Sequence, residues 1–170
     1  MPEYRRRFRP GGAYFFTVVT AQRRPVLADR DAVQALRESV AVEQRRRPFR
    51  VIAAVVLPDH LHMVWRLPAG DVDYPTRWAA IKARFTRWHL ASGREEAAVT
   101  ENQGLAGRRG VWQPRFLEHT IRDEEDMARH VDYVHRNPVK HGYVERMSDW
   151  PYSSIHRRLR REMAAVGRTG

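Results

Sequence analysis

Cysteine and long apolar runs are both missing from this chain. The 170 residues include no cysteine, which excludes disulfides, zinc–thiolate sites and cysteine nucleophiles. No stretch approaches the roughly 20 apolar residues that a transmembrane helix needs, so no membrane partner is expected. The basic start, MPEYRRRFRPGG, is not followed by the apolar segment of a secretory signal. These absences together predict a cytoplasmic protein.

Lysine is also scarce, although the chain is strongly basic. Lysine and arginine total 31 against 20 acidic residues, a net charge of +11, and only Lys82 and Lys140 are lysines. Such an excess predicts attraction to a polyanion, most often nucleic acid. The planar arginine fork can hold a phosphate or a guanine with two hydrogen bonds. A GC-rich genome would also explain the ratio of arginine to lysine, but it would not explain the net charge.

The length and the 42% hydrophobic content predict a single domain over residues 1–170 with a substantial core. Three segments stand apart from that core by composition. Residues 1–12 form a basic N-terminal arm, residues 90–110 a glycine-rich flexible loop, and residues 156–170 a basic C-terminal tail.

Hydrophobic periodicity and breaker residues predict an α+β fold with an antiparallel sheet covered by helices. Strands are expected at residues 13–20, 49–57, 60–67 and 111–118, the second and third forming a hairpin. Helices are expected after a cap at Asp29 or Asp31, at 73–89, at 123–136 with Pro138 as the stop, and at 151–161.

Two histidines are the first candidates for chemistry. His60 and His62 are two residues apart in a predicted strand, so both side chains leave the same face of the sheet. Two adjacent imidazoles suit one divalent metal ion. A pair of hydrogen-bonded or surface histidines is the alternative, and the spacing alone favours it.

Tyr133 and Asn137 are the second candidates. They are four residues apart in a predicted helix and therefore share one face. A tyrosine hydroxyl, with an ordinary pKa of about 10, needs nearby positive charge or a metal to act as a nucleophile. Arg129, Arg136 and Lys140 could supply that charge. The alternatives are that Tyr133 belongs to the core and that Asn137 only ends the helix.

Taken together, the motifs are similar to those of a known family. His60-Leu61-His62 fits the histidine–hydrophobe–histidine signature of HUH single-strand DNA nucleases, and VDYVHRNPVKHGYV resembles the tyrosine helix of single-tyrosine transposases. With VVLPDHLHMVW, RWAAIKARFT, WQPRFLEHTIRDEEDMARH and SDWPYSS, the chain resembles REP-associated tyrosine transposases from about Tyr4 to Ile155. The resemblance implies a ferredoxin-like, RRM-like HUH nuclease fold.

The resemblance also implies a reaction and its residues. His60, His62 and Asn137 would hold Mg²⁺ or Mn²⁺, and Tyr133 would attack the scissile phosphate to give a 5′-phosphotyrosine and a free 3′-hydroxyl without ATP. The implied substrate is single-stranded DNA with a REP-type hairpin and a short guide sequence. The protein would act as a monomer or homodimer, associated with the nucleoid.

Basic residues near these motifs are candidates for DNA contacts, because arginines interleaved with aromatic residues suit single-stranded DNA. They are Arg5, Arg6, Arg7, Arg77, Lys82, Arg84, Arg115 and Lys140. For each one, a solvated surface charge is an equally good interpretation. Two other functions stay open: a DNA-binding regulator that recognises the hairpin without cutting, and a basic RNA-binding α+β protein that is indifferent to metal.

Overall fold

Four antiparallel strands, in the order β2–β3–β1–β4, form the centre of the computed structural model, which describes residues 11–168. The strands are β1 Ala13–Val19, β2 Arg50–Val56, β3 His60–Arg66 and β4 Leu117–Thr120. The α-helices are α1 Arg30–Arg46, α2 Tyr74–Ala91, α3 Glu101–Leu105, α4 Glu124–Lys140 and α5 Ile155–Val166, and 3-10 turns lie at η1 Ala21–Arg23 and η2 Met147–Asp149. The order β1-α1-β2-β3-α2-β4 with this strand arrangement is ferredoxin-like, which confirms the α+β prediction.

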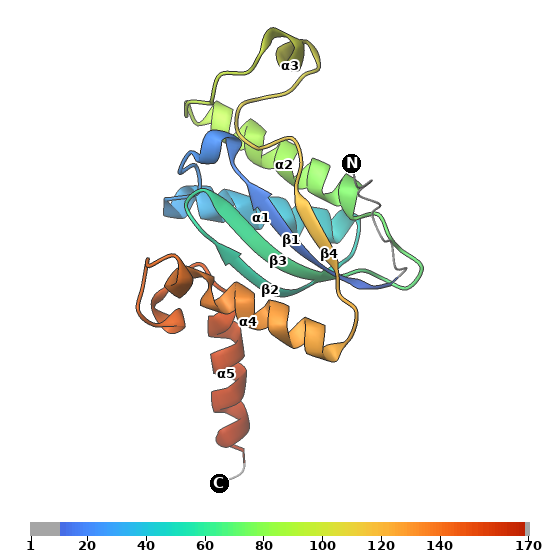
Figure 1. Ribbon diagram of the computed structural model, residues 1–170, viewed down its shortest axis with the longest axis vertical. Coiled ribbons are helices and arrows are strands. Elements are labelled where there is room, and N and C mark those ends of the chain that lie inside the picture. The colour runs from blue at the N-terminus through green and yellow to red at the C-terminus, as the bar shows by residue number, and fades with distance from the viewer. Residues whose placement is uncertain (1–10, 169–170) are drawn as a thin grey trace, which may run out of the picture.

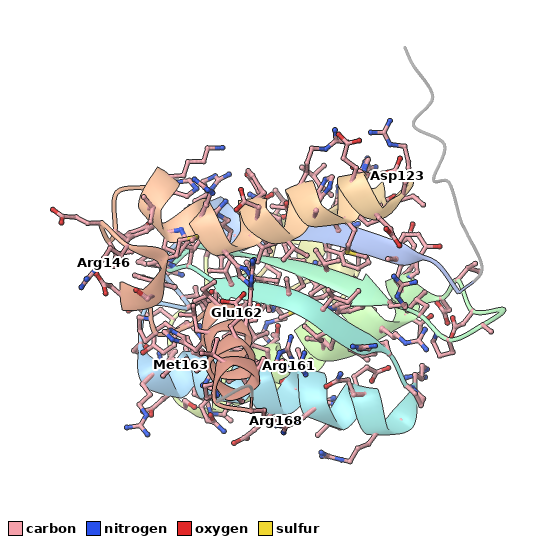
Figure 2. The ribbon with its side chains drawn as sticks, turned by 90° about the horizontal axis from the view of Figure 1, so that it is seen from below. Asp123, Arg146, Arg161, Glu162, Met163 and Arg168 are labelled. Carbon is pink, nitrogen blue, oxygen red and sulfur yellow. The ribbon has the colours of Figure 1, made fainter. Side chains whose placement is uncertain are left out.

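The sheet separates two layers of helices (Figures 1 and 2). Because strand side chains alternate between faces, Phe16, Met63 and Trp65 pack with α1 and α2 in the larger core cluster. Residues of the opposite face, among them Val55 and Val64, pack against α4 in a smaller cluster. Val64 follows His62 by two residues and His60 by four, so both histidines of β3 lie on the same α4-facing side of the sheet as Val64.

Aspartates begin three of the helices. Asp29 accepts a hydrogen bond from the backbone N–H of Ala32 at 3.0 Å, so it is Asp29 rather than Asp31 that caps α1. Asp73 caps α2 in the same way, and Asp123 accepts from the N–H of Asp126 at 2.8 Å at the start of α4. The acidic first turn of α4 also complements the positive end of the helix dipole.

The prediction that Pro138 ends the catalytic-motif helix is wrong. Helix α4 contains the proline and continues to Lys140. The actual stop is Gly142, which has a φ of +75°. The Gly142 N–H donates to the carbonyl of Val139 at 2.9 Å, and the Tyr143 N–H donates to the carbonyl of Pro138 at 3.0 Å. This pair of bonds is the Schellman motif, and it keeps Asn137 inside the helix.

The strand predicted at 111–118 is displaced. β4 begins only at Leu117, after Pro114, and Trp112 contributes a single isolated bridge to Thr20. The basic helix predicted at 151–161 is displaced likewise, since α5 runs from Ile155 to Val166 and projects away from the sheet (Figure 1).

The glycine-rich 90–110 segment is more structured than a simple loop. Helix α3 begins with a capping box in which Thr100 and Gln103 bond each other's backbone N–H groups. The two ends of the 97–110 part of this segment are joined by a hydrogen bond, in which the Ala97 N–H donates to the Gly110 carbonyl at 2.7 Å. A side chain at Gly110 would collide with the Ala97 backbone, so this close approach requires glycine. No helix among residues 11–168 is both long and apolar enough to span a bilayer.

Candidate active site

The two histidines lie in the middle of the sheet, on the face that α4 covers. β3 pairs with β2 on one side and with β1 on the other, which places it among the most constrained elements of the fold. His60 and His62 are each at least 95% buried, with ring centroids 5.0 Å apart. The strand period predicted from the sequence therefore does bring the two imidazoles side by side.

Each imidazole is oriented through its Nδ1 atom. His60 Nδ1 lies 2.6 Å from a carboxylate oxygen of Asp59, and His62 Nδ1 lies 2.9 Å from the hydroxyl of Thr17 in β1. In the tautomer in which both Nδ1–H groups donate to these oxygens, both Nε2 atoms carry a free lone pair. Fixing a ring through one nitrogen so that the other can bind metal is the usual arrangement at protein metal sites.

The electrostatic surroundings keep His62 uncharged. Burial, together with the neighbouring His60, His141 and Lys140, lowers the pKa of His62 to about 3. At neutral pH the ring is thus the neutral imidazole that metal coordination requires.

Helix α4 faces the histidine pair with a stripe of side chains one turn apart. Tyr133 lies with its ring centroid 5.3 Å from that of His62, and His141 lies 5.1 Å from His60 by the same measure. The helix therefore runs antiparallel to β3 over this region. Asn137 occupies the turn between the two contacts, on the same stripe.

Tyr133 is held by aromatic contacts but remains accessible, with 37% of its surface exposed. The ring meets Phe15 of β1 edge-on, at a centroid distance of 5.7 Å. The ammonium of Lys140 lies 4.9 Å from the centroid of the tyrosine ring. The side chain is thus neither a core residue, which was the alternative prediction, nor a freely solvated one.

Asn137 carries the observation that favours a bound cation. The residue is fully buried, and among residues 11–168 neither its amide oxygen nor its amide nitrogen has a hydrogen-bond partner. An unpaired buried amide is costly, and polar groups without a partner cluster at functional sites. One amide oxygen together with two imidazole Nε2 atoms is a donor set that fits a divalent cation, so these residue types fit the metal that the sequence resemblance implies.

Two of the arginines expected at DNA serve the fold instead. Arg77 is almost fully buried, and its five N–H donors bond the Asp71 carboxylate and the backbone carbonyls of residues 47, 48 and 73. Arg84 binds the buried carboxylate of Glu43 at 2.8 Å. Each guanidinium is held by a carboxylate of the protein itself, and removing either arginine would leave its acidic partner without this compensation.

The other candidates for DNA contact are placed differently. Lys82 donates to the carbonyl of Gln113 at 2.7 Å, and burial lowers its pKa to about 8. It lines a cavity of about 700 Å³ between α2 and the 97–114 segment. Arg115 is exposed and makes no ion pair within residues 11–168, and Lys140 lies beside Tyr133. Arg5, Arg6 and Arg7 lie outside the described residues.

Sequence reasoning missed the residues that support the site. Thr17 and Asp59 orient the histidines, Phe15 supports Tyr133, and His141 adds a third imidazole. Only His141 left a usable signal, since it lies four residues after Asn137 and eight after Tyr133 on one helical stripe.

A histidine pair on a central strand, faced by a tyrosine and an amide on one helix, defines the class of HUH-type tyrosine transferases. Comparison with known proteins agrees. The chain is 42% identical over 170 residues to a REP-associated tyrosine transposase of Escherichia coli K12, covering 92% of that protein. A Haemophilus influenzae relative assigned to the same group is 42% identical over 163 residues, which are 96% of this chain and 90% of the relative.

A solved structure gives the same answer. A REP-associated tyrosine transposase bound to a REP hairpin superposes with a TM-score of 0.76 at 42% identity, over 95% of this chain and 87% of that one. The chain matches no protein-family model. With this identity over nearly its full length, the chain belongs to the REP-associated tyrosine transposases.

Proposed function

We propose that this transposase cleaves and rejoins single-stranded DNA beside a REP-type hairpin that carries a short guide sequence, with Tyr133 as the nucleophile. The observation that carries the proposal is the accessible Tyr133 ring against the buried His62, one helical turn from the Asn137 amide, which has no partner in the described part of the chain. The hairpin in the solved relative supports the choice of substrate.

The reaction would be a transesterification at phosphorus. The Tyr133 hydroxyl gives up its proton as its oxygen attacks the scissile phosphate, the bond from phosphorus to the 3′-oxygen breaks, and that leaving oxygen takes up a proton, so the numbers of protons lost and gained are equal. The products are a 5′-phosphotyrosine on the downstream fragment and a free 3′-hydroxyl on the upstream fragment. Attack by a 3′-hydroxyl on the phosphotyrosine reverses the step and returns the tyrosine, so rejoining needs no ATP.

Each residue of the site would have one task. His60, His62 and Asn137 would hold Mg²⁺ or Mn²⁺, which when bound supplies Lewis-acid polarisation of the phosphate. Asp59 and Thr17 keep the two imidazoles in the required orientation.

Charge from the last turn of α4 would complete the site. The Lys140 ammonium, 4.9 Å from the tyrosine ring, would stabilise negative charge that develops on the attacking oxygen and the phosphate. Arg115 and the basic segment Arg5, Arg6 and Arg7 would contribute phosphate contacts beyond the site. A DNA substrate of this kind would place the protein at the nucleoid. The protein would act as a monomer or a homodimer, and the contact of Tyr133 with His62 of its own chain is compatible with a monomer.

The test is a covalent-adduct assay with Mn²⁺ and single-stranded DNA containing the palindrome from the gene's own neighbourhood. A strand labelled at its 3′ end should give a labelled protein adduct on a denaturing gel, whereas a strand labelled at its 5′ end should give only a shorter free fragment. Tyr133→Phe should abolish the adduct and leave hairpin affinity nearly unchanged. Tyr143→Phe is the matched control, because Tyr143 is a similarly exposed tyrosine just beyond the same helix.

The outcomes separate the rival functions. Tight hairpin binding without an adduct, with wild type and Tyr133→Phe alike, would indicate a regulator that does not cut. Preference for RNA over DNA, unaffected by chelator, would indicate an RNA-binding protein. An adduct that persists in Tyr133→Phe would overturn the assignment of the nucleophile.

A further inference from the structure

A second group of ligand-bearing side chains lies at the other end of α4, near Asp123 in Figure 2. His119 of β4 and Asp126 and His130 of α4 place their ligand atoms within 4.8 Å of one another. None of these residues has a part in the reaction proposed above. The two imidazole rings are stacked, with centroids 4.5 Å apart and an interplanar angle of 15°.

The buried carboxylate of Asp126 organises this group. His119 Nε2 lies 2.8 Å from one carboxylate oxygen, and His130 Nδ1 lies 3.2 Å from the other. His130 Nδ1 also lies 2.8 Å from the backbone carbonyl oxygen of Asp126, and a metal ion bound to this nitrogen would replace that hydrogen bond. Asp126 is 1% exposed, whereas about two fifths of the His119 side chain and one fifth of the His130 side chain are exposed. The group is therefore anchored inside the protein and open to water on one side.

The separations of these atoms resemble those around a bound metal. Bonds of about 2.0–2.1 Å from zinc to nitrogen or oxygen place neighbouring ligand atoms of a tetrahedral site roughly 3.3 Å apart. The two observed separations, 2.8 and 3.2 Å, come close to that value before any adjustment. Two imidazoles and one carboxylate form a ligand set that favours transition metals over Mg²⁺, and solvent can complete the coordination.

The remaining capacity of the carboxylate is used by groups that would form an outer shell. The backbone N–H of Arg122 donates to one oxygen at 2.9 Å, and the Arg129 guanidinium donates to the other at 3.3 Å. Such outer-shell donors fix the carboxylate in place. The guanidinium charge of Arg129 also repels a bound dication, so removal of this charge should strengthen metal binding.

The group is separate from the catalytic histidines but lies on the same helical stripe. The ring of Phe15 stands between them, with centroid distances of 4.9 Å to His130 and 5.4 Å to His62. Phe15 also contacts Tyr133, three residues after His130. A ligand that joins β4 to α4 here would therefore hold the helix just before the nucleophile.

We propose that His119, Asp126 and His130 bind one transition-metal dication of the zinc class, distinct from the catalytic cation, and that this ion ties β4 to the first half of α4. The inference does not depend on the proposed DNA cleavage, since it concerns binding of a metal by other residues.

The experiment measures Co²⁺ and Zn²⁺ binding to the full chain in which the catalytic pair has been removed. The background variant carries His60→Ala and His62→Ala, so that binding there cannot be counted. Equilibrium dialysis with metal analysis should find one Co²⁺ per chain, and the visible absorption of the complex should report nitrogen and oxygen ligands. Zn²⁺ should displace the Co²⁺ and raise the melting temperature.

Substitutions in this background identify the ligands. His119→Gln and His130→Gln should each weaken Zn²⁺ binding at least tenfold, whereas the control His156→Gln, in α5, should leave it unchanged. Arg129→Gln should tighten binding several-fold, because it removes a repelling charge. Circular dichroism of each variant in chelator verifies that it is folded.

The proposal would be overturned if the background variant binds no Co²⁺ or Zn²⁺ at millimolar concentration. It would equally be overturned if binding persists unchanged in folded His119→Gln and His130→Gln. In either case the three side chains form only a hydrogen-bonded link between β4 and α4.

Discussion

Replacing Asn137 by leucine should stabilise the metal-free protein while abolishing its activity. In the described structure the amide is fully buried and neither of its polar atoms has a partner. Leucine has a similar size and no polar atoms, so it removes the unpaired groups without opening a cavity. When a buried polar residue is present to bind a ligand, replacing it by an apolar residue is expected to stabilise the ligand-free protein and to abolish its function.

The magnitude follows from the burial of the amide. A buried polar group without a partner costs about 1–3 kcal/mol. Leucine also exceeds asparagine in helix propensity by roughly 0.5 kcal/mol. Allowing for imperfect fit of the branched side chain, we expect Asn137→Leu to raise the free energy of unfolding by about 2 kcal/mol. For a domain of this size, that corresponds to an increase in melting temperature of about 4–8 °C.

The assay is urea unfolding with EDTA, followed by the same measurement with Mn²⁺. The wild-type protein should gain stability with Mn²⁺, whereas Asn137→Leu should not, because one ligand has been removed. The control is Asn102→Leu, which changes the chain's other asparagine at an exposed helical position and should alter stability by less than about 0.5 kcal/mol. If Asn137→Leu is clearly less stable than wild type in EDTA, the amide has partners and the reasoning fails.

Two further predictions concern charge. Arg84→Gln should lower the free energy of unfolding by about 2 kcal/mol, because it removes a charged partner of the buried Glu43, and it should leave DNA affinity unchanged. Arg115→Gln should instead leave the free energy of unfolding unchanged and reduce the salt dependence of hairpin binding, because Arg115 is exposed. Equal effects of both variants on DNA binding would contradict this division. Burial lowers the pKa of His135 to about 4. Between pH 6.5 and pH 4 the unfolded chain therefore takes up a proton at this residue that the folded protein does not, so the free energy of unfolding falls as the pH drops through that range. Between pH 7 and pH 4.5 the wild type should lose about 2 kcal/mol more than His135→Gln in urea unfolding, and equal losses would refute the assignment.

The sequence predicted the local geometry of the site because that geometry follows from periodicity. A two-residue spacing on a strand sends His60 and His62 to one face, and a four-residue spacing on a helix aligns Tyr133 with Asn137. Neither rule states that the helix lies over that strand. The convergence of β3 and α4 depends on tertiary packing, and only the resemblance to a known family anticipated it.

The errors have physical causes that a single segment does not reveal. Pro138 was taken as a helix stop because proline disfavours the helical conformation of the residue before it, yet the end of α4 is set by the left-handed conformation of Gly142. Arg77 was assigned to DNA as a charge on a helix, whereas its partners include backbone carbonyls about thirty residues earlier. His119 was outside the strand predicted at 111–118, so its meeting with Asp126 was not foreseen.

The two faces of the sheet divide stability from chemistry. The larger cluster, with Trp65, Trp78 and Phe16, lies between the sheet and helices α1 and α2, and it supplies most of the apolar burial. The α4 face instead buries His60, His62 and Asn137 among a few aliphatic side chains. Polar groups on that face cost stability that the opposite face must offset. This arrangement accounts for a candidate site in which His60 and His62 are rigidly held by a central strand, whereas Tyr133 and Asn137 belong to a helix packed by a much smaller cluster.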